Sequence, residues 1–126
     1  SIAAGVTTER IARGLGDRGH RVVRTMPNTP LMTGCGATAL APGAHATAHD
    51  MAKARRLFES SGLVVEVRED QLDAVTALSG SGPAYFFLLV EHMVRAGVEM
   101  GLAPDVAHTL ATQTALGAGR MLRESG

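Results

Sequence analysis

The residues of this sequence that could take part in chemistry form none of the usual catalytic sets. Among the 126 residues, no Ser-His-Asp arrangement, no pair of catalytic carboxylates and no cluster of metal ligands stands out. His92 lies in an apolar stretch and could serve as a base, but a histidine that faces solvent is the more common case. We therefore predict no metal site.

The turn Ser79-Gly80-Ser81-Gly82 has the composition of a small anion-binding site. It precedes Pro83, and proline suits the first turn of a helix because its missing N–H would have no intrahelical partner there. The free N–H groups at such a helix start favour an anion. A hinge that lets two helices pack is an equally good interpretation of the same four residues.

A second candidate is the loop Met26-Pro27-Asn28-Thr29-Pro30, which follows an expected strand over residues 21–24. Its two prolines cannot continue a sheet ladder, and they make the loop rigid. In open α/β sheets, ligands collect at the carboxyl ends of strands. From the residues alone, a stiff connector is the favoured interpretation, and a ligand contact is the alternative.

Three further features are interpreted as structural. Gly14, Gly16 and Gly19 match the dinucleotide fingerprint G-x-G-x-x-G, but they follow a helix and precede a strand, the reverse of what the mechanism requires. Cys35 has no neighbouring cation that would activate its thiol, so it is assigned to packing. His45 and His49 flank a polar loop and are expected to face solvent.

Alternating strands and helices position these residues up to about residue 68. Apolar runs predict strands over residues 21–24, 34–40 and 63–67, and helices over residues 9–15 and 51–60. Thr7 or Thr8 is expected to cap the first helix and Asp50 the second. The pattern indicates an α/β unit with a largely parallel sheet. Residues 1–6 have the pattern of a buried strand end, which needs partners on both sides, so we expect a segment of a longer protein.

Only helix signals follow, and we place a domain boundary between residues 68 and 69. Helices are expected to begin at Leu72 and at Pro83, and a last one to cover residues 105–123. From Ala84 to Val90 no residue is charged, and apolar side chains surround the helix, which requires neighbours on every side. We therefore expect an intertwined homodimer.

The composition excludes several classes of function. Lys+Arg and Asp+Glu each number 12, so no electrostatic argument supports binding to nucleic acid or an anionic membrane. The uncharged residues 74–90 are fewer than the roughly 20 apolar residues of a membrane span. A single cysteine excludes an internal disulfide and fits a reducing, cytoplasmic location.

Several separate motifs resemble one family. Residues 73–102, DAVTALSGSGPAYFFLLVEHMVRAGVEMGL, and residues 111–122, ATQTALGAGRML, are similar to the helical domain of pyrroline-5-carboxylate reductases. The upstream segments SIAAGVTTERI, RTMPNTP and GATAL match the same family in the same order. The resemblance implies an α/β Rossmann-like portion followed by an all-α dimerisation domain. Residues 1–68 would be the C-terminal part of the dinucleotide-binding domain, and residues 69–126 an incomplete dimerisation and substrate domain.

The resemblance also implies a reaction, the transfer of hydride from NAD(P)H to the C=N bond of 1-pyrroline-5-carboxylate in the last step of proline biosynthesis. The resemblance favours NADPH as the hydride donor, and NADH is possible. Such a reduction needs alignment and exclusion of water more than protein acids or bases. The implied cofactor contacts are Ile2, Ala3, Ala4, Met26, Pro27, Asn28, Thr29 and Glu69. Thr76, in the DAVT motif, is the candidate catalytic residue, and Thr76 and Ser81 are the candidate substrate contacts.

Two alternatives stay open. A helical dimerisation module would bind no ligand, although it would not need the loop of residues 26–30 at a strand end. A related two-domain hydroxy-acid dehydrogenase usually carries a lysine in the apolar helix, and none lies between Leu72 and Leu102. Family members extend before Ser1 and after Gly126, so we expect this chain alone neither to bind NADPH tightly nor to turn over. Cofactor preference and an oligomer larger than a dimer are not fixed by the sequence.

Overall fold

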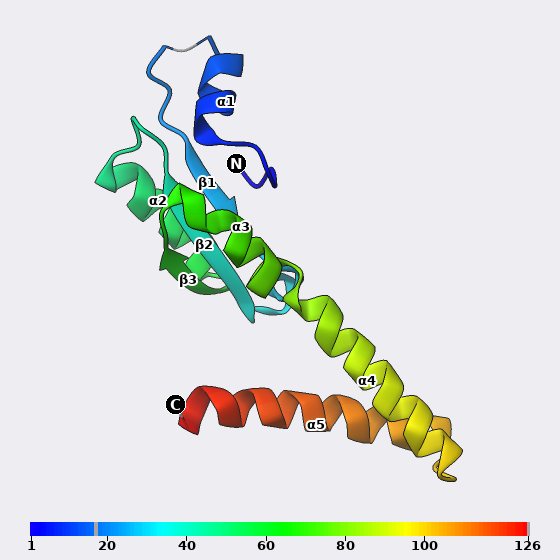
Figure 1. Ribbon diagram of the computed structural model, residues 1–126. Helices are drawn as coiled ribbons and strands as arrows, with labels where there is room; N and C mark the ends of the chain where they lie inside the picture. The colour runs from blue at the N-terminus through cyan, green and yellow to red at the C-terminus, as the bar shows by residue number, and fades with distance from the viewer. Residues whose placement is uncertain (17, 126) are drawn as a thin grey trace. The chain divides into compact units, whose positions relative to one another are not determined.

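The structure, a computed structural model, describes residues 1–16 and 18–125 and divides into two compact units, residues 1–83 and 84–126 (Figure 1). The first unit extends beyond the predicted boundary at residue 69 because the segment after that boundary packs on the sheet. Leu72 of this segment is buried in one cluster with Met26. The predicted division into domains of residues 1–68 and 69–126 remains a prediction. Gly126, the last residue of the second predicted domain, lies outside the described residues.

The first unit contains a mixed three-stranded sheet in the order β1-β2-β3, formed by β1 (Val23–Met26), β2 (Gly36–Pro42) and β3 (Gly62–Glu66). Strands β2 and β3 are parallel, but β1 and β2 are antiparallel, with Thr25 opposite Leu40. The prediction of a largely parallel sheet is therefore wrong for β1. Its connection to β2 holds only the 3-10 helix η1 (Thr29–Thr33) and is shorter than the dozen or more residues that a parallel crossover needs. The helix α2 (Ala48–Glu59) supplies such a crossover between β2 and β3.

The central strand β2 carries a small core on each of its faces. One core contains Leu40, Met51 and Val64, and the other contains Met26, Ala39, Ala41 and Leu72. Successive side chains of a strand point to opposite faces, so Leu40 faces α2 while its two neighbours face the helix that begins at Leu72. Leu40 is 0% exposed and is the centre of its core.

Two glycines form the first pair of the parallel ladder between β2 and β3. Gly62 has a φ of +147°, which residues with a side chain rarely adopt, and a Cβ there would overlap the backbone of Gly36. A Cβ on Gly36 would in turn lie 2.7 Å from the Cβ of Leu31. Only backbone atoms therefore fit at this end of the ladder.

Threonine residues cap α1 (Thr8–Gly14) and α2, two of the helices of the sheet unit. Thr7 caps α1, and its hydroxyl accepts a hydrogen bond from the Arg10 N–H at 3.2 Å. Thr47, rather than the predicted Asp50, caps α2. Asp50 lies at the third helical position, where its carboxylate accepts from the Thr47 N–H at 2.9 Å and completes a capping box.

Residues 1–6 do not form the predicted strand. Ser1 lies beside β1, where its nitrogen donates to the Val23 carbonyl at 2.7 Å and its carbonyl accepts from the Thr25 N–H at 2.8 Å. The chain then turns at Gly5, whose φ is +69°, and residues 2–4 are exposed. The expectation that this segment is buried is therefore wrong.

The predicted turn at residues 79–82 is a π-helical turn within a nearly continuous helical segment. The segment comprises η2 (Glu69–Gln71), α3 (Leu72–Val75), the π-helical η3 (Thr76–Gly80) and α4 (Gly82–Glu99). The Ser81 N–H donates to the Thr76 carbonyl, five residues earlier, at 2.8 Å, which is the bonding pattern of a π-helix. The prediction that this turn exposes free N–H groups is therefore wrong for the Ser81 N–H, and the interpretation of the turn as a hinge stays a prediction.

The second unit consists of residues 84–99 of α4 and the helix α5 (Pro104–Ser125). Helix α4 ends near Gly101, whose φ is +101°, and the Leu102 N–H donates to the Gly97 carbonyl at 3.0 Å. Ala107 is buried, and its Cβ lies 3.2 Å from the position that a Cβ on Gly97 would take. Small residues thus allow the two helices to approach each other closely.

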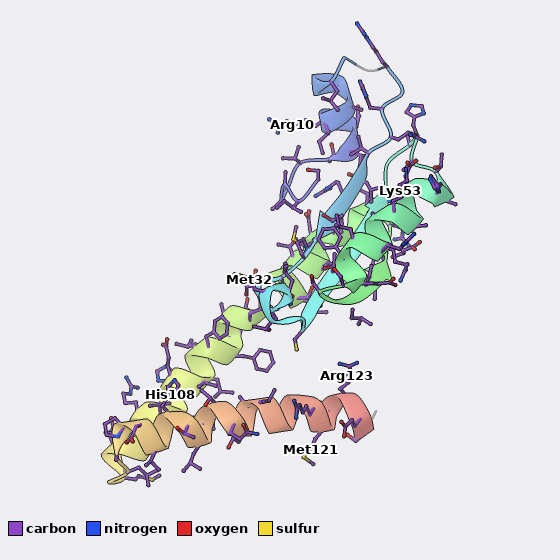
Figure 2. All side chains as sticks on the ribbon, turned by 180° about the vertical axis from the view of Figure 1, so that it is seen from behind. Arg10, Met32, Lys53, His108, Met121 and Arg123 are labelled. Atoms are coloured by element: carbon purple, nitrogen blue, oxygen red, sulfur yellow. The ribbon has the colours of Figure 1, made fainter. Side chains whose placement is uncertain are left out.

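Most large apolar side chains of the second unit remain exposed. The consecutive residues 85–89 of α4, Tyr-Phe-Phe-Leu-Leu, are each between 54% and 64% exposed. Figure 2 shows Met121 and Arg123 projecting from α5 in different directions. The described chain therefore does not supply the surrounding neighbours that the apolar circumference of α4 requires.

Candidate functional site

The first part of the candidate site is the loop that follows β1. Met26 ends this strand and is buried, and its Sδ lies 3.5 Å from the position that a Cβ on Gly80 would take. Thr29 is exposed, and Pro27 is partly exposed. The Met26 side chain is thus used for packing, which leaves the backbone of the loop and the side chains of Pro27 and Thr29 available to a ligand.

Asn28 links this loop to two other segments of the sheet unit. Its Nδ2 donates to the Ser79 carbonyl at 3.1 Å, and its Oδ1 accepts from the Ala37 N–H at 2.9 Å. The predicted cofactor contact through the Asn28 amide would have to compete with these two bonds.

Thr76 and Ser81 lie at the two ends of the π-helical turn. The Thr76 hydroxyl donates to the Leu72 carbonyl at 2.7 Å, so its oxygen faces any ligand as an acceptor. Thr76 is partly buried, and its Cγ2 lies 3.6 Å from the position of a Cβ on Gly80. Ser81 is exposed. The turn therefore presents one oriented hydroxyl and one freely accessible hydroxyl.

Glu69 joins the start of α1 to the segment that follows β3. Its Oε1 accepts from the Thr8 N–H at 2.6 Å and from Arg24 Nη1 at 3.0 Å, and its Oε2 accepts from the Thr8 hydroxyl at 2.7 Å. Arg24 is only 4% exposed, whereas the Glu69 side chain is 29% exposed. The carboxylate is the counterion of a buried guanidinium, and its predicted contact with a cofactor stays a prediction.

The hydrogen bonds to Glu69 also change its acidity. Partial burial raises the pKa of the Glu69 carboxyl, but the bonds from Thr8 and Arg24 outweigh this effect and hold the pKa below its usual value of 4.5. Glu69 is therefore ionised at neutral pH and is unsuited to act as an acid there.

An open depression of about 420 Å³ lies beside this cluster. It is lined by Gly5, Thr7, Arg24, Glu69, Asp70 and Asp73. Three carboxylates against one guanidinium make the lining acidic, which does not favour a phosphate group. The exposed residues 2–4 immediately precede this depression in the chain, so a cofactor contact there would use neutral backbone and small side chains.

The structure brings the predicted site residues into two groups, each anchored by a buried residue of β1. Where the strand ends, Met26 packs beside Gly80 and Asn28 bonds Ser79, both in the π-helical turn that begins at Thr76, and Glu69 joins Thr8 beside Arg24. Arg24 was not named as a site residue from the sequence, and Thr8 was named only as a possible helix cap. The available signal was the charge of Arg24 within an expected strand, because a buried charge requires a counterion.

The remaining candidates have structural or solvent-facing positions. His92 is exposed, and its Nδ1 lies 3.0 Å from Nη2 of Arg95. His45 and His49 are exposed, as predicted. Cys35 is also exposed, so its assignment to packing is wrong, because it precedes β2 instead of pointing into the core.

The glycines of the G-x-G-x-x-G stretch follow a helix, as predicted. Gly14 is the last residue of α1, and Gly16 and Gly19 have φ values of +90° and +69°. Asp17 of this stretch lies outside the described residues. The described part of the stretch is therefore a helix end and loop, which does not have the geometry of a phosphate-binding helix start.

Metal-binding clusters and membrane-spanning helices are both absent from residues 1–16 and 18–125. No group of three or more His, Cys, Asp or Glu side chains is arranged to hold a metal ion. Neither α4 nor α5, nor any other helix in these ranges, is both long enough and apolar enough to cross a membrane.

Comparison with known proteins relates both units to a single family. Residues 69–126 match the family model for pyrroline-5-carboxylate reductase dimerisation. The pyrroline-5-carboxylate reductase of Synechocystis is 45% identical over 99% of this chain and 46% of its own length. The Mycobacterium tuberculosis reductase is 49% identical over 98% of the chain and 42% of its own length. This chain thus spans less than half the length of these curated relatives.

Solved structures of pyrroline-5-carboxylate reductases are also similar to this chain. A pyrroline-5-carboxylate reductase from Coxiella burnetii superposes with a TM-score of 0.90 at 43% identity, covering 98% of this chain and 46% of the other. The Plasmodium falciparum pyrroline carboxylate reductase, solved with NADP bound, has a TM-score of 0.90 at 32% identity and covers 98% and 49%. At these identities the similarity extends to the sequence as well as to the fold.

Proposed function

We propose that this chain is a member of the pyrroline-5-carboxylate reductase family and forms part of an enzyme that reduces 1-pyrroline-5-carboxylate to L-proline with NADPH. The observation that carries the proposal is the unbroken similarity over 98% to 99% of the chain. NADPH is chosen because a relative of 32% identity was solved with NADP bound, and NADH is the alternative donor. A cytoplasmic location remains a prediction from the sequence.

In the complete enzyme, bound NADPH would supply a hydride to the carbon of the protonated C=N bond, and the ring nitrogen would keep its proton and become a secondary amine. The exposed Thr29 and the backbone of residues 26–29 would hold the nicotinamide side, since the Met26 and Asn28 side chains are engaged within the protein. The exposed residues 2–4 would provide further backbone contacts. These groups bind and align, which is the main requirement of the reaction.

Thr76 and Ser81 are proposed to hold the substrate. The Thr76 hydroxyl already donates to the Leu72 carbonyl, so its oxygen would accept a hydrogen bond from the protonated ring nitrogen. Ser81 is exposed, and its hydroxyl would donate to the substrate carboxylate. Thr76 would thus stabilise the protonated imine without being a nucleophile.

A second copy of the same chain is the proposed neighbour of α4 and α5. Residues 85–89 are more than half exposed although they are apolar, and residues 69–126 match a dimerisation model. Exposed apolar patches of this kind mark association surfaces. An intertwined homodimer would cover them.

The test uses a protein in which this chain is extended to the full length of its relatives. A spectrophotometric assay then measures NADPH oxidation that depends on 1-pyrroline-5-carboxylate. Thr76→Val should lower kcat/KM by about 2- to 10-fold, because one hydrogen bond to the substrate is lost. Thr76→Ser keeps the hydroxyl and should stay near the wild-type rate. Absence of pyrroline-dependent oxidation in the completed protein would refute the proposed function, whereas the 126-residue chain alone is expected to be inactive.

A further inference from the structure

We propose that Asn28 is a positioning residue, whose side-chain amide clamps the π-helical turn η3 to the loop after β1 and so holds Thr76 beside that loop. This inference rests on the proposed function for its catalytic consequence. Its structural part concerns only residues of the first unit and can be tested without any ligand.

The contacts of Asn28 fix the orientation of its amide. The Ala37 N–H can only donate, and it lies 2.9 Å from Oδ1. The Ser79 carbonyl can only accept, and it lies 3.1 Å from Nδ2. An aspartate would keep the first bond but would set a carboxylate against the Ser79 carbonyl, so this position requires an amide.

The Ser79 carbonyl needs a donor because of the sequence that follows it. In an α-helix this carbonyl would accept from the N–H four residues later, but that residue is Pro83, which has no N–H. Asn28 supplies a donor from outside the helical segment. The clamp thus satisfies a backbone group at the place where the regular helical ladder changes to the π pattern.

Packing at the same place ties the clamp to Thr76. A Cβ on Gly80 would lie 3.5 Å from Met26 Sδ and 3.6 Å from Thr76 Cγ2. Both distances are in the range of ordinary van der Waals contact, so the turn packs against the Met26 side chain at the end of β1. The Asn28–Ser79 bond and this packing together hold the turn that carries Thr76 against the loop that is proposed to meet the nicotinamide.

The structural experiment measures amide hydrogen exchange in the 126-residue chain by NMR. Asn28→Asp should raise the exchange rate of the Ser81 amide, which bonds the Thr76 carbonyl, by about 5-fold, because one hydrogen bond contributes roughly 1 kcal/mol. The Ala37 amide should stay protected. The Met51 amide, which bonds the Thr47 carbonyl in α2, reports on folding and should not change.

Thr33→Val is the matched control, since its hydroxyl bonds the Pro30 carbonyl in the same loop at 3.0 Å without contacting η3. It should leave the Ser81 amide unchanged. A Ser81 rate within twofold of wild type in Asn28→Asp would overturn the proposal. An equal rise at Met51 would also overturn it, because Asn28 would then serve general stability.

The catalytic experiment uses the completed reductase. Asn28→Asp should lower kcat by about 10- to 100-fold through misalignment while the KM for NADPH changes less than twofold. A raised KM for NADPH with unchanged kcat would overturn the proposal and assign Asn28 a direct cofactor contact. An inactive wild-type protein would refute the proposed function, but the exchange experiment would still decide whether the clamp exists.

Discussion

The two units of this chain bury their apolar side chains to very different extents. In the sheet unit, β2 lies between two small cores, and Leu40 is completely buried. In the helical unit only Ala107 and Ala111 are buried among the described apolar residues, while larger side chains are exposed. The first unit buries the apolar residues of its own cores, whereas the second leaves most of its large apolar side chains exposed. The same chain thus combines a unit with its own core and a unit whose exposed apolar side chains form the proposed association surface.

The largest expected effect is on the stability of the sheet unit. Leu40→Ala should lower the free energy of unfolding by about 2–5 kcal/mol, because it removes buried apolar volume and leaves a cavity. Urea unfolding followed by circular dichroism measures this change. Leu63→Ala on the adjacent strand β3, where the side chain is exposed, is the matched control. Equal losses in the two variants would contradict the assignment of the core.

The next effect concerns the helical unit. Replacing both Phe86 and Phe87 with serine should raise the dissociation constant of self-association by about 30-fold or more, equivalent to about 2 kcal/mol. Sedimentation velocity over a range of protein concentrations measures it. Leu57→Ser, at an exposed position of α2, should leave association unchanged. If the wild-type chain stays monomeric at every concentration, the exposed apolar side chains of the helical unit are not an association surface. That result would contradict the proposed contrast between the two units.

The smallest effect tests how the sheet unit holds α1. Glu69→Gln should lower the free energy of unfolding at pH 7 by about 1–2 kcal/mol, since buried Arg24 loses its counterion while water still reaches the partly exposed site. The lowered pKa of Glu69 means that its stabilisation is complete above 4.5 and is lost as the pH falls through the folded-state pKa. The difference between wild type and variant should therefore shrink in acid.

Chemical unfolding at several pH values checks this prediction, with Glu66→Gln as the control. Glu66 bonds Arg55 at 2.9 Å on the surface, and an exposed pair of this kind contributes at most about 0.5–1 kcal/mol. Hydrogen exchange at the Ala107 amide, which bonds Ala103 in the helical unit, should not respond to Glu69→Gln. A response there would show that the two units are coupled energetically.

Local signals in the sequence predicted most elements of the fold. Thr7 was one of the two residues predicted to cap α1, Pro83 lies in the first turn of α4, and each of the three predicted strands overlaps an observed one. These features depend on residues close together in the chain. Strand direction is different, because it depends on how the short connection after Met26 folds back, and the strand-helix alternation wrongly suggested a parallel arrangement.

The candidate site was predicted less completely because its contacts join distant segments. Asn28 and Thr76 were both named from the sequence, but nothing there indicated that the Asn28 amide bonds Ser79. The pairing of Arg24 with Glu69 likewise joins residues 45 positions apart. The π-helical turn was read as a break because glycine and serine usually interrupt helices, whereas here tertiary hydrogen bonding keeps the segment helical.

The glycine pair at the start of the parallel ladder limits how this sequence can change during evolution. An added Cβ on Gly62 meets the backbone of Gly36, and one on Gly36 meets Leu31. A backbone obstacle cannot be relieved by making a neighbouring side chain smaller, so no second substitution elsewhere compensates for a change at Gly62. Drift at this position is blocked whatever the polarity or size of the new residue. By contrast, an added Cβ at Gly117 or Gly119 of α5 meets nothing within 4 Å in the chain, so within the chain itself these two positions can vary independently.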